Sequence, residues 1–339
     1  MANINKVKEE LKQSKYNFLK TEEDLGKNIH ILKIGGSKLY GTNTETSDTD
    51  IRGICSNRID DMLGLSNRFE QFIHNDTDTV IYTLNKIFSK FNNSNPNTIE
   101  IISPEGIIYS DKIGQEIIDN RHLFLSKEAF FSFGGYARGQ LDRLINVLEG
   151  KTQVKEEQEK LLMRSLETKV SNFNLRYKPK FNAEIFKDNE VYKLNFEGKN
   201  LEASEFLNMS QELRDIVLKI KKVGHRNNKK TIEGISKHAM HLIRLYYTGI
   251  DILLKEEIIA YREAEHDILC GIRKSDIRDS NGFVRKDILE LKDELEIKMK
   301  EAYDKSKLPD KPDFEAIQKL LVKLNTMTLK NRGVLGNVY

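Results

Sequence analysis

The chain has 339 residues, of which 32% are charged and 38% are hydrophobic, a balance typical of a soluble globular protein with one or two domains. Its 55 basic and 52 acidic residues leave a net charge of +3, which does not by itself indicate a nucleic-acid partner. No apolar run approaches the length of about 18 residues that a membrane span needs, and the N-terminus has no signal-peptide pattern, so we expect a cytoplasmic protein without a membrane partner.

Helical and extended patterns alternate in the first hundred residues. The first twenty residues have a loose helical period, and strands are expected at 29–34, 48–55 and 78–83. Thr83 is a candidate N-cap for a following helix. The buried face of that helix is expected to consist of four apolar residues at helical spacing: Leu84, Ile87, Phe88 and Phe91.

The pattern changes near residue 106, after which long helical segments dominate. An alternating stretch at 183–196 with a polar turn predicts a β-hairpin within them. We therefore expect an α+β protein, with a small mixed sheet and its helices at 1–106 and a mostly helical domain at 107–339. The expected helices lie at 127–149, 155–170, 204–222, 232–256, 258–273, 284–304 and 312–330.

Two aspartates lie one residue apart in the second expected strand. Asp48, Asp50 and Arg52 would share one face of it. Carboxylates spaced about 7 Å apart along a strand repel each other unless a cation lies between them. Mg²⁺ takes one or two carboxylates together with waters and substrate phosphates, and a pair of such ions activates an attacking oxygen and stabilises a leaving pyrophosphate. The pattern predicts two Mg²⁺ ions, with Mn²⁺ as an alternative.

A glycine-serine turn precedes these acids. Glycine lets the backbone approach a phosphate closely, and the N–H groups of Gly36 and Ser37 with the serine hydroxyl are suited to hold its oxygens. A calcium-type surface loop or a turn rich in Asn and Asp is the simpler interpretation of the same residues.

The order glycine-serine, polar loop, Asp-x-Asp resembles the polymerase-β-like nucleotidyltransferase superfamily. Within it, the stretch GGSKLYGTNTETSDTDIRGI is most similar to the predicted nucleotidyltransferases found beside RNA-repair ligases and in phages. Thr49 departs from the apolar residue that is common at its position. Further similarity lies in 90–102, 134–144 and 237–245. The residues that match the family pattern are Gly36, Ser37, Tyr40, Gly41, Ser47, Asp48, Asp50, Arg52 and Gly53.

The resemblance implies a third carboxylate on a neighbouring strand, for which Asp78 is the first choice and Asp76 the alternative. It implies that Asp48, Asp50 and Asp78 are the catalytic and metal-binding residues. An inactive copy of the fold is the competing interpretation. The residues that the resemblance implies for nucleotide binding are Gly36, Ser37, Lys38, Tyr40, Arg52, Lys237, His241 and Arg244.

Three of those residues come from the helical half. At about 100° per residue, Lys237, His241 and Arg244 cluster on one face of the helix expected at 232–256, opposite an apolar face. Cationic groups on one face suit a triphosphate, although a solvated polar face is the simpler interpretation. His238 lies off this face and is expected to be structural.

Three other features leave alternatives open. Glu100 lies in an apolar run, where a buried acid needs a partner, so we expect it to pair with an arginine. Tyr136 and the polar residues after it, Arg138, Gln140 and Arg143, allow contact with a base or ribose, or core packing with solvated arginines. The basic run at 219–230 is either a solvated loop or an RNA contact.

Together these features predict transfer of a nucleoside monophosphate from an NTP to an acceptor hydroxyl, with release of pyrophosphate. An RNA 3′ end is the favoured acceptor because of the family resemblance. The alternatives are nucleotidylation of a protein or small molecule, and a non-catalytic module that binds nucleotide or RNA. The sequence leaves the base preference and the oligomeric state open.

Overall fold

The structure is a computed structural model that describes residues 4–65, 68–148, 181–188, 191–198, 214 and 232–334. Contacts divide the chain into two compact units, Met1–Leu144 with Ile232–Tyr339, and Ile145–Thr231. This grouping differs from the expected division at residue 106, because segments from both sides of that residue belong to the first unit. Within the described part of the chain, no helix is both long enough and apolar enough to span a bilayer.

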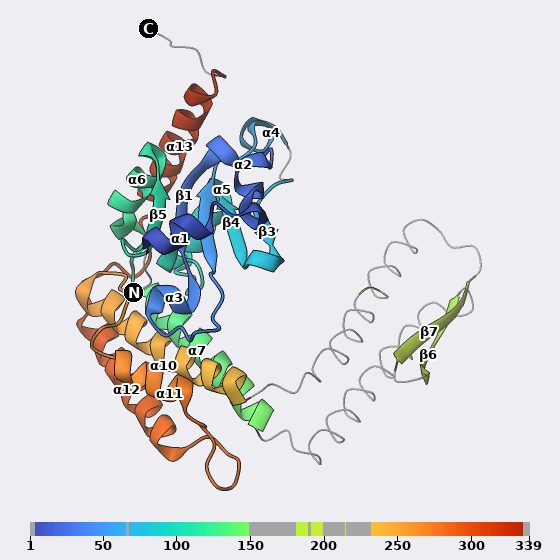
Figure 1. Cartoon of the computed structure of the whole chain (residues 1–339), viewed down its shortest axis with the longest axis vertical. Coiled ribbons are helices and arrows are strands. Elements are labelled where there is room, and N and C mark those ends of the chain that lie inside the picture. The colour runs from blue at the N-terminus through green and yellow to red at the C-terminus, as the bar shows by residue number, and fades with distance from the viewer. Residues whose placement is uncertain are drawn as a thin grey trace. The chain divides into compact units, whose positions relative to one another are not determined.

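The first unit is an α+β structure built around a five-stranded mixed sheet (Figure 1). Its strand order is β3-β4-β2-β1-β5, in which β2 and β4 are parallel and the other neighbours are antiparallel. The strands are β1 (Ile29–Ile34), β2 (Ile51–Cys55), β3 (Gln71–His74), β4 (Thr79–Thr83) and β5 (Ile107–Ser110).

The register of the sheet brings three chain segments to one end of it. Ile34, the last residue of β1, pairs with Ile51, the first residue of β2, and Ile51 also pairs with Thr79, the first residue of β4. The chain therefore leaves β1 at the same end where it enters β2 and β4. The glycine turn and the residues just before β2 and β4 are neighbours for this reason.

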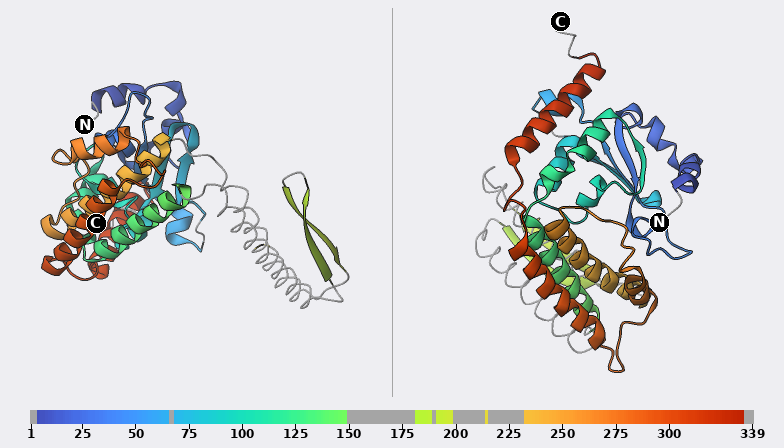
Figure 2. Two further views of the ribbon diagram at one scale, coloured as in Figure 1. Left: turned by 90° about the horizontal axis from the view of Figure 1, so that it is seen from below. Right: turned by 90° about the vertical axis from the view of Figure 1, so that its left-hand side faces the viewer.

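Short helices surround the sheet. Val7, Tyr16 and Leu19 from the N-terminal helices belong to the same buried core as Leu32 and Ile51 of the sheet. The blue N-terminal helices and the red C-terminal helix lie on opposite sides of the sheet (Figure 2). The α-helices of this part are α1 (Ile4–Glu10), α2 (Phe18–Thr21), α3 (Gly36–Tyr40), α4 (Ile59–Leu63), α5 (Leu84–Asn92) and α6 (Lys112–Asp119).

Long helices form the rest of the first unit. The central helix α10 packs against α11 and α12, and its Gly249 lets Phe133 of α7 and Met299 of α12 approach the backbone. The last helix, α13, packs on α5 beside the sheet. These helices are α7 (Glu128–Leu148), α10 (Ile232–Lys255), α11 (His266–Lys274), α12 (Lys286–Lys305) and α13 (Phe314–Asn331).

Three of the five strands of this sheet were predicted from the sequence, and one of them has the observed bounds. The strand at 29–34 is confirmed, whereas the expected second and third strands begin at Ile51 and Thr79, so that Asp48, Asp50 and Asp78 precede their strands. Neither β3 nor β5 was predicted from the sequence.

The helix after Thr83 is confirmed in detail. The Thr83 hydroxyl accepts from the N–H of Lys86 as an N-cap, and the four apolar residues of the expected face are buried: Leu84, Ile87, Phe88 and Phe91.

The expected helix at 258–273 is wrong in its first half, because α11 begins only at His266. Buried Arg262 donates to Asp251 of α10 at 2.6 Å and to Glu265 at 3.1 Å, and these bonds hold the preceding segment in a non-helical path. The expected helices at 155–170 and 204–222 lie outside the described residues, apart from helical Arg214.

In the second unit, the described residues form the expected hairpin. Its strands are β6 (Phe181–Asp188) and β7 (Val191–Gly198), paired antiparallel with Ala183 opposite Phe196.

Candidate active site

The turn that follows β1 is shaped around an aspartate. Gly35 N–H donates to the Asp50 carbonyl at 2.9 Å, and Gly36 has φ +58°, a left-handed conformation that favours glycine. A Cβ at Gly36 would lie 1.9 Å from the Asp50 carboxylate oxygen Oδ2. The turn and the carboxylate are therefore in van der Waals contact, and no larger residue fits between them.

Arg52 holds the same carboxylate from the other side. Its Nη2 lies 3.0 Å from Asp50 Oδ1, and its Nη1 donates to the carbonyls of Ile51 and Asp78, at 3.0 and 2.5 Å. Burial raises the pKa of Asp50, Arg52 opposes that effect, and the negative charge of Asp78 adds to it. Asp50 is thus a half-buried acid in the field of a second acid, with an arginine as its counter-ion.

Asp78 occupies a strained position at the start of β4. Its φ is +46°, in the left-handed region that residues other than glycine seldom adopt. Its carbonyl accepts from the Ile51 N–H at 3.2 Å and from Arg52, so its backbone joins β2 to β4 while its side chain stays exposed. Backbone outliers of this kind cluster at functional sites.

Asp48 lies at a polar hollow of about 240 Å³ beside this end of the sheet. Asp76, Asp78 and Glu10 also line it, so four carboxylates border one space. The wall opposite comes from the N-terminal segment: Glu10, Lys15 and Tyr16.

Lys38 and Thr49 fix the loop that carries Asp48. The Lys38 amine donates to the Thr49 hydroxyl, which in turn donates to Glu10 Oε2 at 2.8 Å. The Ser47 hydroxyl accepts from the Thr44 N–H at 2.8 Å and closes the loop before it. These residues therefore contact one another and hold the loop in place.

The carboxylates of Asp48, Asp50 and Asp78 suit a hard divalent cation in their chemistry, because carboxylate oxygens are the ligands that Mg²⁺ takes in proteins. Among the residues that the structure describes, however, no three acidic, histidine or cysteine side chains form a group able to hold a metal. Arg52 already neutralises Asp50. Asp48, Asp50 and Asp78 therefore have the right donor atoms but are not arranged as a ligand set.

Helix α10 adds a cation to this end of the sheet. Lys237 is exposed, and its positive charge opposes the rise that burial causes in the pKa of Asp50. Burial, with the neighbouring Arg244 charge, lowers the pKa of His241 to about 3. The low pKa disfavours a charge on His241, so Lys237 and Arg244 are the groups of this face that favour a positive charge.

Arg244 is buried in an ion pair. Its exposed fraction is 3%, its Nη1 lies 3.3 Å from Glu100 Oε2, and its guanidinium lies 3.6 Å from the centre of the Tyr40 ring. The Tyr40 hydroxyl donates to the other Glu100 oxygen, and Arg244 Nη2 lies 3.1 Å from His241 Nδ1. The expectation that Glu100 pairs with an arginine is confirmed. The network joins α3, which begins at the glycine turn, to α10.

Comparison with protein families identifies the family of the chain. A family model described as RNA repair pathway DNA polymerase beta family matches residues 7–323. The chain belongs to this family. No curated protein matches the chain. The family resemblance on residues 35–54 is thereby confirmed, and the match covers both the sheet and the long helices of this RNA repair polymerase-β family protein.

Of the residues expected to act in this family member, four meet at the sheet end: Gly36, Asp50, Arg52 and Asp78. Ser37 is half-buried in the first turn of α3. Tyr40 and Arg244, expected to bind nucleotide, are instead buried around Glu100. Their position indicates that they orient α3 and α10 rather than reach a ligand.

The N-terminal residues Glu10 and Tyr16 are part of this site but were not predicted from the sequence. They lie far from Asp48 in sequence, and a loose helical period gives no indication of which face a short helix turns to a sheet. Gln140 contacts His238 at 3.1 Å, and the Tyr136 hydroxyl accepts from Asn97, which favours packing for both. The Arg143 side chain and the basic run at 219–230 lie outside the described residues.

Proposed function

We propose that this protein transfers a nucleoside monophosphate from an NTP to a hydroxyl group at an RNA 3′ end and releases pyrophosphate. The observation that carries the proposal is the contact between Gly36 and the Asp50 carboxylate, beside Asp78, in a member of a polymerase-β family. That contact brings a turn suited to phosphate and an acid suited to a metal to the same point.

The chain's own groups have separate roles in this proposal. The N–H groups of Gly36 and Ser37, with the serine hydroxyl, hold the β- and γ-phosphates at the glycine turn. Exposed Lys237 offsets the negative charge of the triphosphate, since it already acts on Asp50. Lys38 remains with Thr49 and keeps the loop of Asp48 in place.

Asp48, Asp50 and Asp78 are not arranged as a ligand set in the structure, so the proposal requires their carboxylates to draw together when two Mg²⁺ ions, or Mn²⁺ as the alternative, bind. Ions held there would make the attacking hydroxyl more nucleophilic and would stabilise the charge of the leaving pyrophosphate. Asp50 becomes free for this role when Arg52 releases its Oδ1.

Asp78 orients the attacking hydroxyl and accepts its proton. The acceptor oxygen then forms a bond to the α-phosphorus while the bond from that phosphorus to the oxygen of pyrophosphate breaks. The products are an RNA longer by one nucleotide and pyrophosphate.

The experiment measures release of pyrophosphate from NTPs with single-stranded RNA and Mg²⁺, for wild type and for Asp50→Asn and Asp78→Asn. Asparagine keeps the size of aspartate and tolerates the left-handed conformation at residue 78, so the variants remove charge without new backbone strain. We expect the rate to fall by more than about a hundredfold in both.

Asp76→Asn is the matched control, because Asp76 lines the same hollow and lies two residues from Asp78 in the chain. It should retain nearly the full rate. A loss in Asp50→Asn and Asp76→Asn but not in Asp78→Asn would assign the third carboxylate to Asp76, and equal rates in all four proteins would contradict the proposal. Label from an NTP that enters protein rather than RNA would favour nucleotidylation, and NTP binding without turnover would favour a non-catalytic module.

A further inference from the structure

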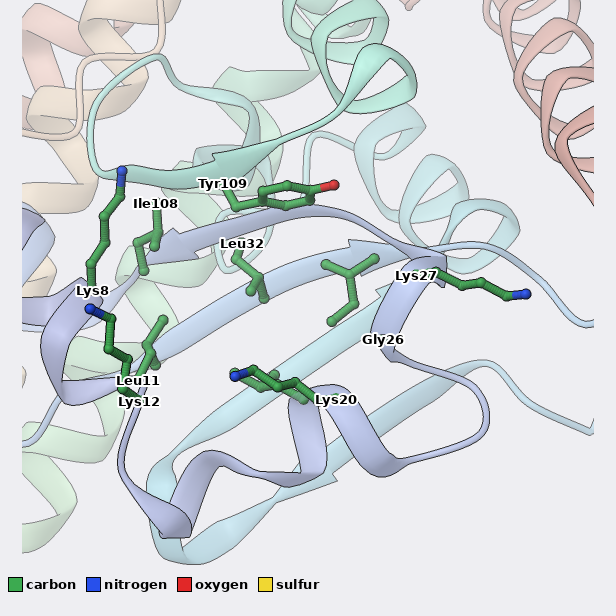
Figure 3. Close-up of a pocket in the computed structure, with 11 residues that line it drawn as sticks. Lys8, Leu11, Lys12, Lys20, Gly26, Lys27, Leu32, Ile108 and Tyr109 are labelled. Atoms are coloured by element: carbon green, nitrogen blue, oxygen red, sulfur yellow. The ribbon is translucent and has the colours of Figure 1, made fainter.

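A second and larger hollow lies between the N-terminal helices and the face of the sheet at β1 and β5 (Figure 3). Its volume is about 580 Å³, within the range of about 300–1,000 Å³ that ligand sites have. The interior is aliphatic and consists of Leu11, Leu19, Ile29, Leu32 and Ile108.

Four lysines surround this aliphatic interior: Lys8, Lys12, Lys20 and Lys27. All four are exposed, and only Lys12 has an ion-pair partner among the described residues, Glu9 at 2.7 Å. Among the residues that the structure describes, no acidic side chain lines the hollow. An apolar interior with unneutralised cations at its edge is complementary to a ligand that is both anionic and partly apolar.

The spacing of the lysines distinguishes between ligands of that kind. Lys8 and Lys12 lie at the end formed by α1, Lys27 lies at the other end beside Gly26, and Lys20 lies between the ends (Figure 3). An amphiphile with a single charged head group meets only one of these ends. A single-stranded nucleic acid, which carries a phosphate at every nucleotide, contacts the lysines at both ends.

Tyr109 adds a surface on which a base can stack. Its ring borders the hollow from β5, which is the edge strand of the sheet, and 48% of the residue is exposed. Proteins that bind single-stranded nucleic acid combine a positively charged groove with exposed aromatic rings in this way.

The N-terminal segment connects this hollow to the candidate active site. Lys8, Leu11 and Lys12 line the aliphatic hollow, whereas Glu10, Lys15 and Tyr16 of the same short segment line the hollow of Asp48 and Asp78. The same short segment of the chain therefore lines both hollows.

We infer that the lysine-edged hollow binds the single-stranded RNA acceptor, on the 5′ side of the 3′ end that reacts. The phosphates contact the lysines, and one or more bases pack on the aliphatic interior and on Tyr109. This inference rests on the proposed function for the identity of the acceptor, but the binding itself requires neither NTP nor metal.

The test measures binding of a fluorescent single-stranded RNA of about ten nucleotides by anisotropy, without NTP or metal. Wild type is compared with Lys20→Ala/Lys27→Ala and with the control Lys319→Ala/Lys330→Ala, which removes the same charge from exposed positions on α13. We expect the first variant to bind about tenfold more weakly and the control to bind as wild type does. The slope of log affinity against log salt should become shallower by about 1.4 in the first variant, for two lost phosphate contacts.

Tyr109→Ala tests the stacking surface independently of charge. Loss of one stacked base should weaken binding by roughly tenfold and leave the salt slope unchanged. Equal RNA affinity in wild type and in both hollow variants would overturn the inference. Binding to vesicles with anionic lipid, in the absence of RNA binding, would overturn it as well and identify the occupant as an amphiphile.

Failure of this inference is distinguishable from failure of the proposed function. If wild type extends RNA and the hollow variants bind and extend it equally well, the function stands and this hollow is not the RNA site. If the hollow variants lose RNA binding but wild type transfers no nucleotide, the site stands and the reaction is wrong.

Discussion

The Asp50 carboxylate occupies the space that a side chain on Gly36 would need. A Cβ at Gly36 would lie 1.9 Å from Asp50 Oδ2 and 2.5 Å from its Cγ, and the φ of +58° adds strain for any residue with a Cβ. We therefore predict that Gly36→Ala displaces Asp50, lowers the unfolding free energy by at least about 1–2 kcal/mol, and removes nucleotidyl transfer.

The matched control is Gly271→Ala, because Gly271 lies within α11 and a Cβ there has no neighbour within 4 Å. Alanine is the better helix former by about 1 kcal/mol, so this variant should be as stable as wild type or more so. Urea unfolding and the pyrophosphate assay measure both effects. Full stability and activity in Gly36→Ala would show that the turn does not constrain Asp50.

Arg244 and Glu100 give a second prediction, because each is the charged partner of the other within the protein. Removing one partner leaves a buried charge unpaired, so Arg244→Met and Glu100→Gln should each lower the unfolding free energy by about 3 kcal/mol. The double variant should lose less than the sum of the two. The coupling energy from urea unfolding of the four proteins is expected to exceed about 1 kcal/mol.

A role in phosphate contact predicts a different outcome for the same residues. If Arg244 contacts the triphosphate directly, Arg244→Met raises KM for the NTP and leaves stability close to that of wild type. The burial of Arg244 and its contact with the Tyr40 ring favour the stabilising role.

Local patterns allowed several elements to be predicted from the sequence. The apolar spacing of Leu84, Ile87 and Phe91 depends only on the helical period, so the sequence alone located that helix and its buried face. The strand at 29–34 was also located from its local pattern, and the structure buries all six of its residues. The need of a buried acid for a counter-ion was sufficient to predict an arginine partner for Glu100.

The rest depends on contacts between distant segments. Periodicity assigned Asp48 and Asp50 to the strand itself, but ladder pairing begins at Ile51, where β1 and β4 both meet β2. Sequence periodicity does not show that Arg244 is buried rather than exposed, because that depends on Glu100 lying opposite it. The contribution of Glu10 to the site depends on how a short N-terminal helix packs on the sheet.

His30, Asp111 and Ser56 form a third testable cluster. His30 Nδ1 lies 2.9 Å from Asp111 Oδ2 and its Nε2 lies 2.7 Å from the Ser56 hydroxyl, the order of groups found in serine nucleophiles. Ser56 is only 3% exposed, however, and a nucleophile has to reach its substrate. Asp111 also caps α6, since its Oδ1 accepts from the Gly114 N–H at 2.8 Å.

We therefore predict that this cluster stabilises the fold and does not react. Asp111→Ala should lower the unfolding free energy by about 2 kcal/mol through loss of the cap and of the His30 partner. A fluorophosphonate probe should leave Ser56 unlabelled in the native protein, as judged by mass spectrometry. Labelling that disappears in Ser56→Ala would instead reveal an accessible nucleophile.

Lys33 of β1 carries the last prediction because its amine is buried. It is 1% exposed, and its Nζ donates to the Ser103 carbonyl and hydroxyl, each at 2.5 Å. Burial lowers the pKa of Lys33 to about 7, although the charges of Glu105 and Glu100 oppose that shift. The folded protein therefore loses the Lys33 proton near neutral pH, whereas the unfolded chain keeps it up to its ordinary pKa of 10.5.

Between those two pKa values the unfolded chain binds more protons than the folded chain, so the contribution of Lys33 to stability rises with pH. Methionine at this position does not titrate, and its difference from wild type isolates the effect. Whatever the offset from the lost Ser103 contacts, Lys33→Met should be more stable relative to wild type at pH 7 than at pH 9, by about 2 kcal/mol. Urea unfolding at the two pH values measures this change, and Lys319→Met, at an exposed position, should show none. A difference between Lys33→Met and wild type that does not vary with pH would mean that Lys33 stays protonated within the folded protein.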